Sequence, residues 1–250
     1  MKKDRLGEEK YNYQGCLMKI IEYNNANNLI VEFQDEHRYK KKCHYRKFED
    51  GGISNYYFKS LHGIGCLGNT KTKNGNITKK SYNTWNSMIE RCYTKKYKAY
   101  EDCSVCKEWL IYENFEKWYD ENYYEVEKEP MQIDKDILYH NNKTYSPNTC
   151  VFVPQPINTL FTKRKNGRGC YKIGVHYNER LRKYIASCGV FSKEFKLNPY
   201  LGCYKTEEEA FVVYKEQKEK IIKMVAEKYK DKIPTILYVA MLEYSVHKDD

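Results

Sequence analysis

The C-terminal third of the chain contains the stretch Leu201-Gly202-Cys203-Tyr204-Lys205-Thr206-Glu207-Glu208-Glu209-Ala210, in which a strand pattern changes to a helix pattern. Thr206 followed by three acidic residues predicts a helix N-cap with an acidic first turn, which the helix dipole favours. Upstream, residues 173–177 and 183–187 have the composition of two further strands. The region therefore predicts a three-stranded sheet followed by a helix. A last helix from residue 234 either folds back on this sheet and helix or makes a dimer contact, and folding back is favoured.

The central part of the chain predicts helices on either side of a hairpin. Apolar residues at 85, 88, 89 and 92 recur with helical spacing and form one stripe. A second helix is predicted over residues 113–121, where three aromatic residues share a face. Residues 131–153 alternate like a hairpin, and residues 156–162 predict a short helix with proline in its first turn. The order is therefore strand, strand, helix.

The N-terminal part predicts a small β module. Strand-like runs at residues 17–23, 29–33 and 38–43 are separated by turn-rich segments, and glycine-rich segments end the module. We therefore expect an α+β fold with three modules. They are a small β module at residues 1–70, a central ββα module with flanking helices at 81–162, and a three-stranded sheet packed on a helix at 169–250.

Composition points to an anionic partner. The 250 residues carry a formal net charge of +10, and Lys and Arg gain affinity for nucleic acid by releasing counterions from phosphates. The ten cysteines are spread over a long chain whose first residues are charged, so we expect no export signal and reduced thiols. No apolar stretch approaches the ~20 residues that a spanning helix needs. The expectation is a cytoplasmic protein without a membrane segment.

Several motifs of the central part follow one another in a characteristic order. They are Ser81-Tyr82-Asn83-Thr84-Trp85, Val105-Cys106-Lys107-Glu108-Trp109-Leu110, Ile133-Asp134-Lys135-Asp136-Ile137-Leu138 and Tyr145-Ser146-Pro147-Asn148-Thr149-Cys150. This order resembles a family of bacteriophage proteins related to HNH homing endonucleases. The resemblance implies that residues 131–162 form the ββα element of an HNH nuclease and that double-stranded DNA is the partner.

The residue expected to do the chemistry is replaced. Family members that cut DNA typically end the first strand of the element with an Asp-His pair, in which His is the general base. The matching positions here are Asp134-Lys135, and a Lys with its usual pKa of about 10.4 keeps its proton at pH 7. The resemblance therefore implies weak or absent cleavage. Remaining activity would be a Mg²⁺-dependent nick using Asp134, Asp136, His140 and Asn158, with Asp134 and Asn158 as metal ligands. The alternative is that the two acids only fix the hairpin.

The C-terminal module resembles the plant ethylene-response-factor (APETALA-type) DNA-binding domain. The resemblance rests on Gly174-Val175, Tyr184-Ile185-Ala186 and the turn into the helix at 201–210. In that family a three-stranded sheet lies in the DNA major groove and the helix packs behind it. Basic residues are also concentrated here, although a solvated basic linker and turn remains the alternative. The predicted phosphate contacts are Lys163, Arg164, Lys165 and Arg168, and the predicted sheet contacts are Lys172, Tyr177, Arg180, Arg182, Lys183 and Tyr184.

A second hypothesis belongs to a different class. Loss of the catalytic His with retention of the frame suits a phage counter-defence or regulatory protein that binds a host immune protein or sequesters a signalling nucleotide. Residues 113–136 hold nine acids against three basic residues, which suits a basic protein partner and would repel DNA. Salt-dependent binding to duplex DNA would favour the first hypothesis, and copurification with a host protein without DNA affinity would favour the second.

Overall fold

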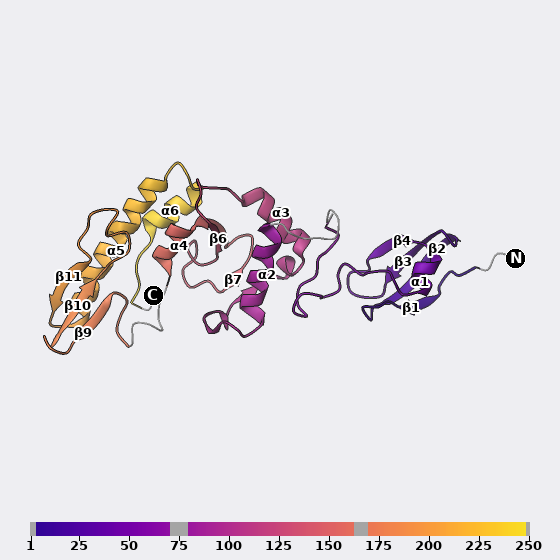
Figure 1. Ribbon diagram of the computed structural model, residues 1–250, viewed down its shortest axis with the longest axis horizontal. Helices are drawn as coiled ribbons and strands as arrows, with labels where there is room; N and C mark the ends of the chain where they lie inside the picture. Colours follow the sequence, from indigo (N-terminus) through magenta and orange to yellow (C-terminus); the bar gives the residue numbers. More distant parts are fainter. Residues whose placement is uncertain (1–3, 71–79, 163–169, 249–250) are drawn as a thin grey trace. The chain divides into compact units, whose positions relative to one another are not determined.

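The computed structural model describes residues 4–70, 80–162 and 170–248 (Figure 1). It mixes helices and sheets, with an antiparallel sheet near the N-terminus and a three-stranded sheet packed on a helix near the C-terminus. Contacts divide the chain into two compact units. Unit 1 comprises Met1–Asn122 and Lys143–Pro147, and unit 2 comprises Tyr123–Asn142 and Asn148–Asp250.

This division differs from the three predicted modules within residues 81–162. Most of the predicted ββα element belongs to unit 2, because its apolar side chains share one hydrophobic core with the C-terminal sheet and helices. Val153 and Ile157 from the element are fully buried in that core together with Ala186 and Ile221 from the C-terminal region. The predicted boundary at residues 162–169 is therefore not a boundary between separate cores.

Unit 1 begins with an antiparallel sheet in the order β1-β2-β3-β4. The strands β2, β3 and β4 correspond to the three predicted runs, and β1 was not predicted. Alternate residues of its long central strands, such as Met18 and Val31, are fully buried, as expected for a sheet with one covered face. The other face carries a cross-strand row of charges in which Lys19 pairs with Glu9 at 3.0 Å. The elements are β1 (Glu9–Tyr11), β2 (Leu17–Asn25), β3 (Asn28–Phe33), β4 (Lys40–Cys43) and α1 (Tyr45–Glu49).

The rest of unit 1 is helical and is built around aromatic side chains. Trp85 of α2 is fully buried, and its Nε1 donates a hydrogen bond to the carbonyl oxygen of Trp109 at 2.6 Å. The predicted helix at 113–121 is present as α3. The elements are α2 (Lys80–Tyr93), η2 (Lys98–Tyr100), β5 (Ser104–Val105), η3 (Lys107–Leu110), α3 (Tyr112–Asn122) and β7 (Thr144–Tyr145), which pairs with β5 in parallel.

Unit 2 contains a strand, strand, helix arrangement. Strand β6 (Met131–Asp134) pairs with β8 (Val151–Pro154) in antiparallel register, and α4 (Gln155–Phe161) follows and packs on both. The predicted pairing and the short helix are therefore present. The two strands are not joined by a tight turn, however, because the connection between them includes Lys143–Pro147 of unit 1.

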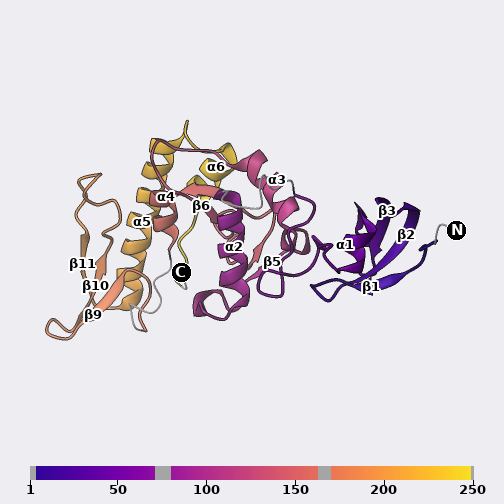
Figure 2. The ribbon, with the colours of Figure 1, turned by 45° about the vertical axis from the view of Figure 1, so that its right-hand side comes forward.

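The C-terminal part of unit 2 has the predicted three strands and helix. Strands β9 (Val175–Asn178), β10 (Lys183–Ser187) and β11 (Tyr200–Tyr204) form a sheet in the order β11-β10-β9. Helix α5 (Glu207–Tyr229) packs against all three strands, and Figure 2 shows it beside the sheet.

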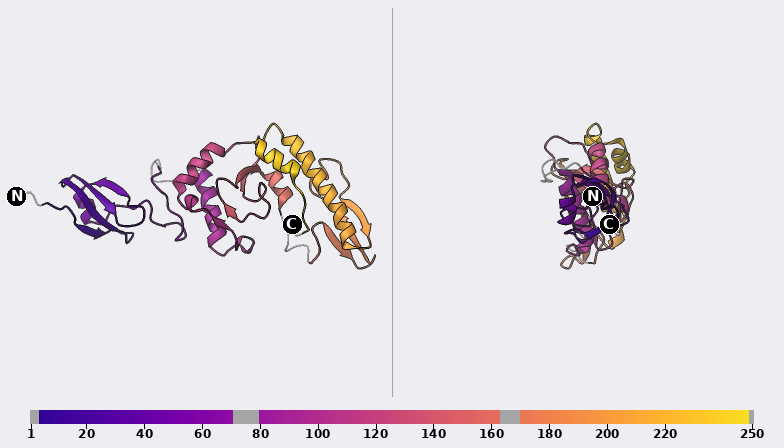
Figure 3. Two further views of the ribbon diagram at one scale, coloured as in Figure 1. Left: turned by 180° about the vertical axis from the view of Figure 1, so that it is seen from behind. Right: turned by 90° about the vertical axis from the view of Figure 1, so that its right-hand side faces the viewer.

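Both ends of α5 are fixed by neighbouring residues. At its start, the Thr206 hydroxyl accepts the Glu209 N–H at 3.2 Å and the Glu209 carboxylate accepts the Thr206 N–H at 3.2 Å, so the predicted cap is a capping box. Helix α6 (Thr235–Glu243) folds back on α5, which was the favoured of the two expected arrangements (Figure 3). None of the helices that the structure describes combines the length and apolar character needed to cross a bilayer.

Candidate nucleic-acid interface

The turn between β9 and β10 presents three cations on a well-defined backbone. The Asn178 Oδ1 accepts the Leu181 N–H at 2.9 Å, and the Arg182 N–H donates to the Glu179 carbonyl at 3.3 Å. Arg182 adopts a left-handed backbone with φ 51°, which closes the turn so that Lys183 pairs with Asn178. The side chains of Arg180, Arg182 and Lys183 are all exposed. These three residues, called the hairpin cations below, are the predicted DNA contacts that the structure leaves most accessible.

The two predicted tyrosine contacts lie on the other side of the sheet. Directly opposite residues of antiparallel strands share a face, and faces alternate along each strand. Tyr184 pairs with Tyr177, and Ala186, two residues on, is fully buried in the unit 2 core. The rings of Tyr177 and Tyr184 meet edge to face at 5.0 Å, and Tyr184 packs against the core. Both are therefore half-buried on the side that α5 covers, because Ala186 fixes the register.

The open face of the sheet carries residues that the sequence reasoning did not select. His176, Ile185 and Cys203 lie directly opposite one another across the three strands; His176 is exposed, whereas Ile185 is buried. Tyr200 is 49 % exposed, and its hydroxyl lies 3.0 Å from the Cys203 Sγ. The signal was available in the alternation of β10, since the small Ala186 marks the face covered by a helix. His176 then follows on the opposite face. Tyr200 reaches that face because the register shifts between Ala186 and Ser187, so that Tyr200 pairs with Ser187.

Lys172 is engaged by the start of α5. Its backbone N–H donates to Glu207 Oε1 at 2.6 Å, and its ammonium group forms an ion pair with Glu208. The hydrogen bond to Glu208 raises the pKa of Lys172 and lowers the pKa of Glu208. Lys172 therefore ties the entry of β9 to α5. The predicted phosphate contacts Lys163, Arg164, Lys165 and Arg168 lie outside the described residues.

In the element formed by β6, β8 and α4, Asp134 builds a turn. Its Oδ1 accepts the backbone N–H groups of Asp136 at 2.9 Å and Ile137 at 2.8 Å. Burial, and secondarily the charge of Asp136, raises the pKa of Asp134 from 3.8 to about 6. Lys135 is 8 % exposed, with its Nζ 3.4 Å from Asp136 Oδ1, and its carbonyl oxygen accepts Asn142 Nδ2 at 2.7 Å. Asp134 therefore has the structural role that was the alternative to catalysis, because its carboxylate fixes the turn after β6.

The remaining predicted nuclease residues contact different neighbours. Asn158 of α4 donates to the Gln132 side chain, on the same face of β6 as Asp134. The His140 ring lies 4.3 Å from the His247 ring and 6.3 Å from the Tyr244 ring, measured between centroids. Within residues 4–70, 80–162 and 170–248, no three His, Cys, Asp or Glu side chains gather in a group that could hold a metal. Asp134, Asp136 and His140 therefore do not form one such group.

The acidic segment at 113–136 is largely engaged within its own units. In unit 1, Glu113 and Glu116 of α3 accept hydrogen bonds from the Asn69 N–H at 2.9 Å and the Thr70 hydroxyl at 2.6 Å. Acids of unit 2 also have partners there. These are Glu127 with Lys232 at 2.6 Å, Glu129 with the Tyr229 hydroxyl at 2.7 Å, Asp134 with backbone N–H groups, and Asp136 with Lys135. The segment is therefore not one open acidic face.

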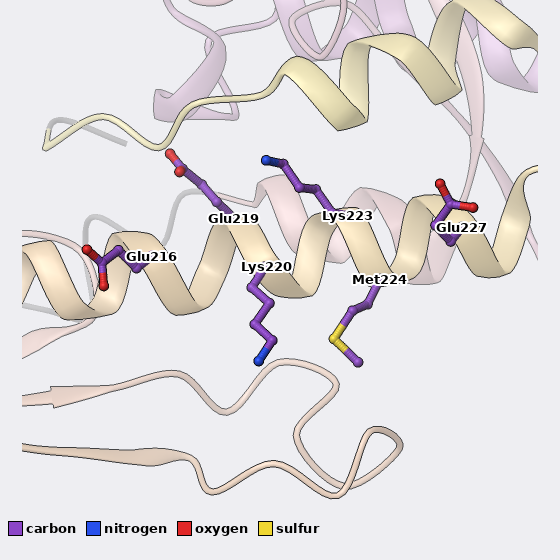
Figure 4. Close-up of a pocket in the computed structure, with 6 residues that line it drawn as sticks. All are labelled: Glu216, Glu219, Lys220, Lys223, Met224 and Glu227. Atoms are coloured by element: carbon purple, nitrogen blue, oxygen red, sulfur yellow. The ribbon is translucent and has the colours of Figure 1, made fainter.

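An open depression of about 520 Å³ runs along α5 (Figure 4). All its lining residues come from this helix, and they carry charges of both signs. Lys220 and Met224 point to one side of the helix, whereas Glu219 and Lys223 point to the other, so these side chains do not converge on one ligand. With two lysines against three glutamates, the depression does not suit a signalling nucleotide. The lining residues are Glu216, Glu219, Lys220, Lys223, Met224 and Glu227.

Comparisons with protein-family models, with curated proteins and with solved structures find no match for this chain. The resemblances drawn from the sequence motifs therefore stay predictions.

Proposed function

We propose that the chain is a phage-encoded protein that binds double-stranded DNA through the C-terminal sheet of unit 2. The observation that carries the proposal is the cluster of hairpin cations Arg180, Arg182 and Lys183, which project from one hydrogen-bonded turn. Arginine contacts guanine edges or phosphates bidentately, and lysine anchors phosphate. A turn held by Asn178 presents these groups with little loss of backbone freedom on binding.

The surroundings of the turn support the same reading. Helix α5 covers one face of the sheet, so the other face and the turn are the parts that can approach a groove. Exposed polar and aromatic side chains, His176 and Tyr200, lie on that open face. The net charge of +10 favours association with a polyanion over the whole chain. Derivation from an HNH homing endonuclease accounts for the ββα order that precedes the sheet.

We propose further that cleavage is weak or absent. Lys135 stands where the general base would be, and its Nζ forms an ion pair with the Asp136 carboxylate at 3.4 Å. Asp134 accepts two backbone hydrogen bonds, and Asn158 donates to Gln132, so these polar groups already serve the fold. The element keeps the frame of a nuclease and lacks a residue placed to activate water.

The test measures the binding of labelled duplex DNA by fluorescence anisotropy across a series of salt concentrations. The variant is Arg180→Gln/Arg182→Gln/Lys183→Gln, which neutralises the hairpin cations. The logarithm of the binding constant falls with the logarithm of the salt concentration, by about 0.9 per phosphate contact. If all three hairpin cations contact phosphates, we expect the variant to show a decline that is less steep by about 2.7. The matched control is Lys40→Gln/Lys42→Gln/Lys47→Gln, which removes the same charge from exposed residues of unit 1.

Three outcomes decide the proposal. Binding that weakens in the hairpin variant and persists in the control supports the sheet as the interface. An equal loss in both variants shows general charge attraction and overturns the assignment to the hairpin. Absence of binding at low salt overturns the function itself and leaves the counter-defence hypothesis to pursue. The same reactions with Mg²⁺ are checked for nicks, and nicks that disappear in Asp134→Ala would overturn the proposed loss of cleavage.

A further inference from the structure

Two histidines from distant parts of the sequence meet in unit 2. His140 belongs to the connection that follows β6, and His247 belongs to the segment that follows α6. Their ring centroids are 4.3 Å apart with an interplanar angle of 34°, and both residues are exposed. This contact between the two rings does not involve the C-terminal sheet or the hairpin cations. It brings together two imidazoles that a solvent ion can reach.

The backbone around His247 is fixed by several contacts. The preceding residue, Val246, is 4 % exposed and packs in the core of unit 2. Its N–H donates to Glu219 Oε1 at 2.8 Å, and its carbonyl oxygen accepts Lys215 Nζ at 2.7 Å. Tyr244, three residues earlier, packs edge to face on Phe161 of α4 at 4.7 Å. The chain is therefore held in place up to the residue before His247.

The backbone around His140 is also ordered. The Asn142 N–H donates to the Tyr139 carbonyl at 3.0 Å, which closes a turn around His140. The Asn142 side chain donates to the Lys135 carbonyl at 2.7 Å and fixes this turn to the end of β6. A ligand pair that is preorganised in this way loses little freedom when an ion binds.

We infer that His140 and His247 form a site for a late first-row divalent metal ion. Imidazole nitrogen suits Zn²⁺, Ni²⁺ and Cu²⁺, with metal–nitrogen bonds of about 2.0–2.1 Å. Two rings whose centroids are 4.3 Å apart are close enough for one ion to bind both. Among these ions the order of affinity for nitrogen ligands favours Ni²⁺ and Cu²⁺.

Water completes the coordination sphere, because no third His, Cys, Asp or Glu joins a metal-holding group among the described residues. The bound ion would connect the segment after α6 to the connection after β6. Since binding needs both rings in the folded arrangement, the ion stabilises the folded state of unit 2 by mass action.

The experiment is calorimetric titration of the full chain, prepared without a polyhistidine tag, with NiCl₂. We expect one ion per chain, and binding at least tenfold weaker in His140→Ala and in His247→Ala. The control His44→Ala removes an exposed histidine of unit 1 and should bind as the wild type does. The double variant His140→Ala/His247→Ala measures the background from the cysteine thiols.

A second readout separates the site from adventitious binding. Saturating NiCl₂ should raise the midpoint of thermal unfolding in the wild type and in His44→Ala and leave the double variant unchanged. Circular dichroism without metal establishes that each variant folds. Equal binding by the wild type and the double variant would overturn the inference, as would a loss that is the same in His44→Ala as in His247→Ala.

Discussion

Gly174 stands directly before β9 and lies against Tyr214 of α5. Its φ is +74°, a conformation that costs an L-residue with a side chain about 1–2 kcal/mol. A Cβ built on Gly174 would lie 1.9 Å from Cδ2 of Tyr214, whose ring is 5 % exposed in the unit 2 core. Overpacking of this kind costs about 1–3 kcal/mol. Gly174→Ala should therefore lower the free energy of unfolding of unit 2 by about 2–5 kcal/mol.

The assay is urea denaturation followed by two signals. All three tryptophans (Trp85, Trp109 and Trp118) lie in unit 1, so their fluorescence follows unit 1. Far-ultraviolet circular dichroism follows both units. We expect the dichroism transition to gain a component at lower urea in Gly174→Ala, while the tryptophan transition keeps its midpoint.

Two variants show whether the reason is correct. Gly189→Ala adds a methyl group in the same unit, where no atom lies within 4 Å and φ is not positive, so it should be neutral or slightly stabilising. Tyr214→Leu removes the ring that the new Cβ would meet, so Gly174→Ala should cost less in that background than in the wild type. A Gly174→Ala protein as stable as Gly189→Ala would contradict this explanation, and so would an equal loss of stability in the two backgrounds.

Three further perturbations have expected outcomes. Thr206→Ala removes the hydroxyl that accepts the Glu209 N–H and should destabilise unit 2 by about 1 kcal/mol in the same urea assay. Because the folded-state pKa of Asp134 is raised from 3.8 to about 6, the stability of unit 2 should fall as pH rises through that window, and Asp134→Asn should abolish this fall. Trp85→Phe removes the N–H that donates to the Trp109 carbonyl at 2.6 Å. The free energy of unfolding of unit 1, measured from the remaining tryptophan fluorescence, should therefore fall by about 1–3 kcal/mol.

The elements with strong local signals were predictable from the sequence. Thr206 with three following acids places the start of α5, and the strand composition places β10 at Lys183–Ser187 without error. These signals are local, since a cap and a strand pattern depend on neighbours within a few residues. The apolar stripe of α2 and the aromatic face of α3 belong to the same class.

The candidate site was less predictable because it depends on distant partners. Nothing near Lys172 in the sequence indicates Glu207 or Glu208 as its partners, since the strands of the sheet separate them. His140 meets His247 only because α6 folds back on α5. The face of the sheet on which Tyr184 lies could have been predicted, because successive residues of a strand, such as Tyr184 and Ile185, lie on opposite faces.

The path of the chain between the units has a consequence for how such a protein can be inherited. The chain leaves unit 1 after Asn122, returns for Lys143–Pro147, and leaves again. A gene broken at one point after Asn122 would separate β5 from β7, its parallel partner, and would leave five residues of unit 1 inside the other fragment. Recombination with a single crossover therefore cannot exchange either unit intact, and the two units should pass through lineages as one inherited block.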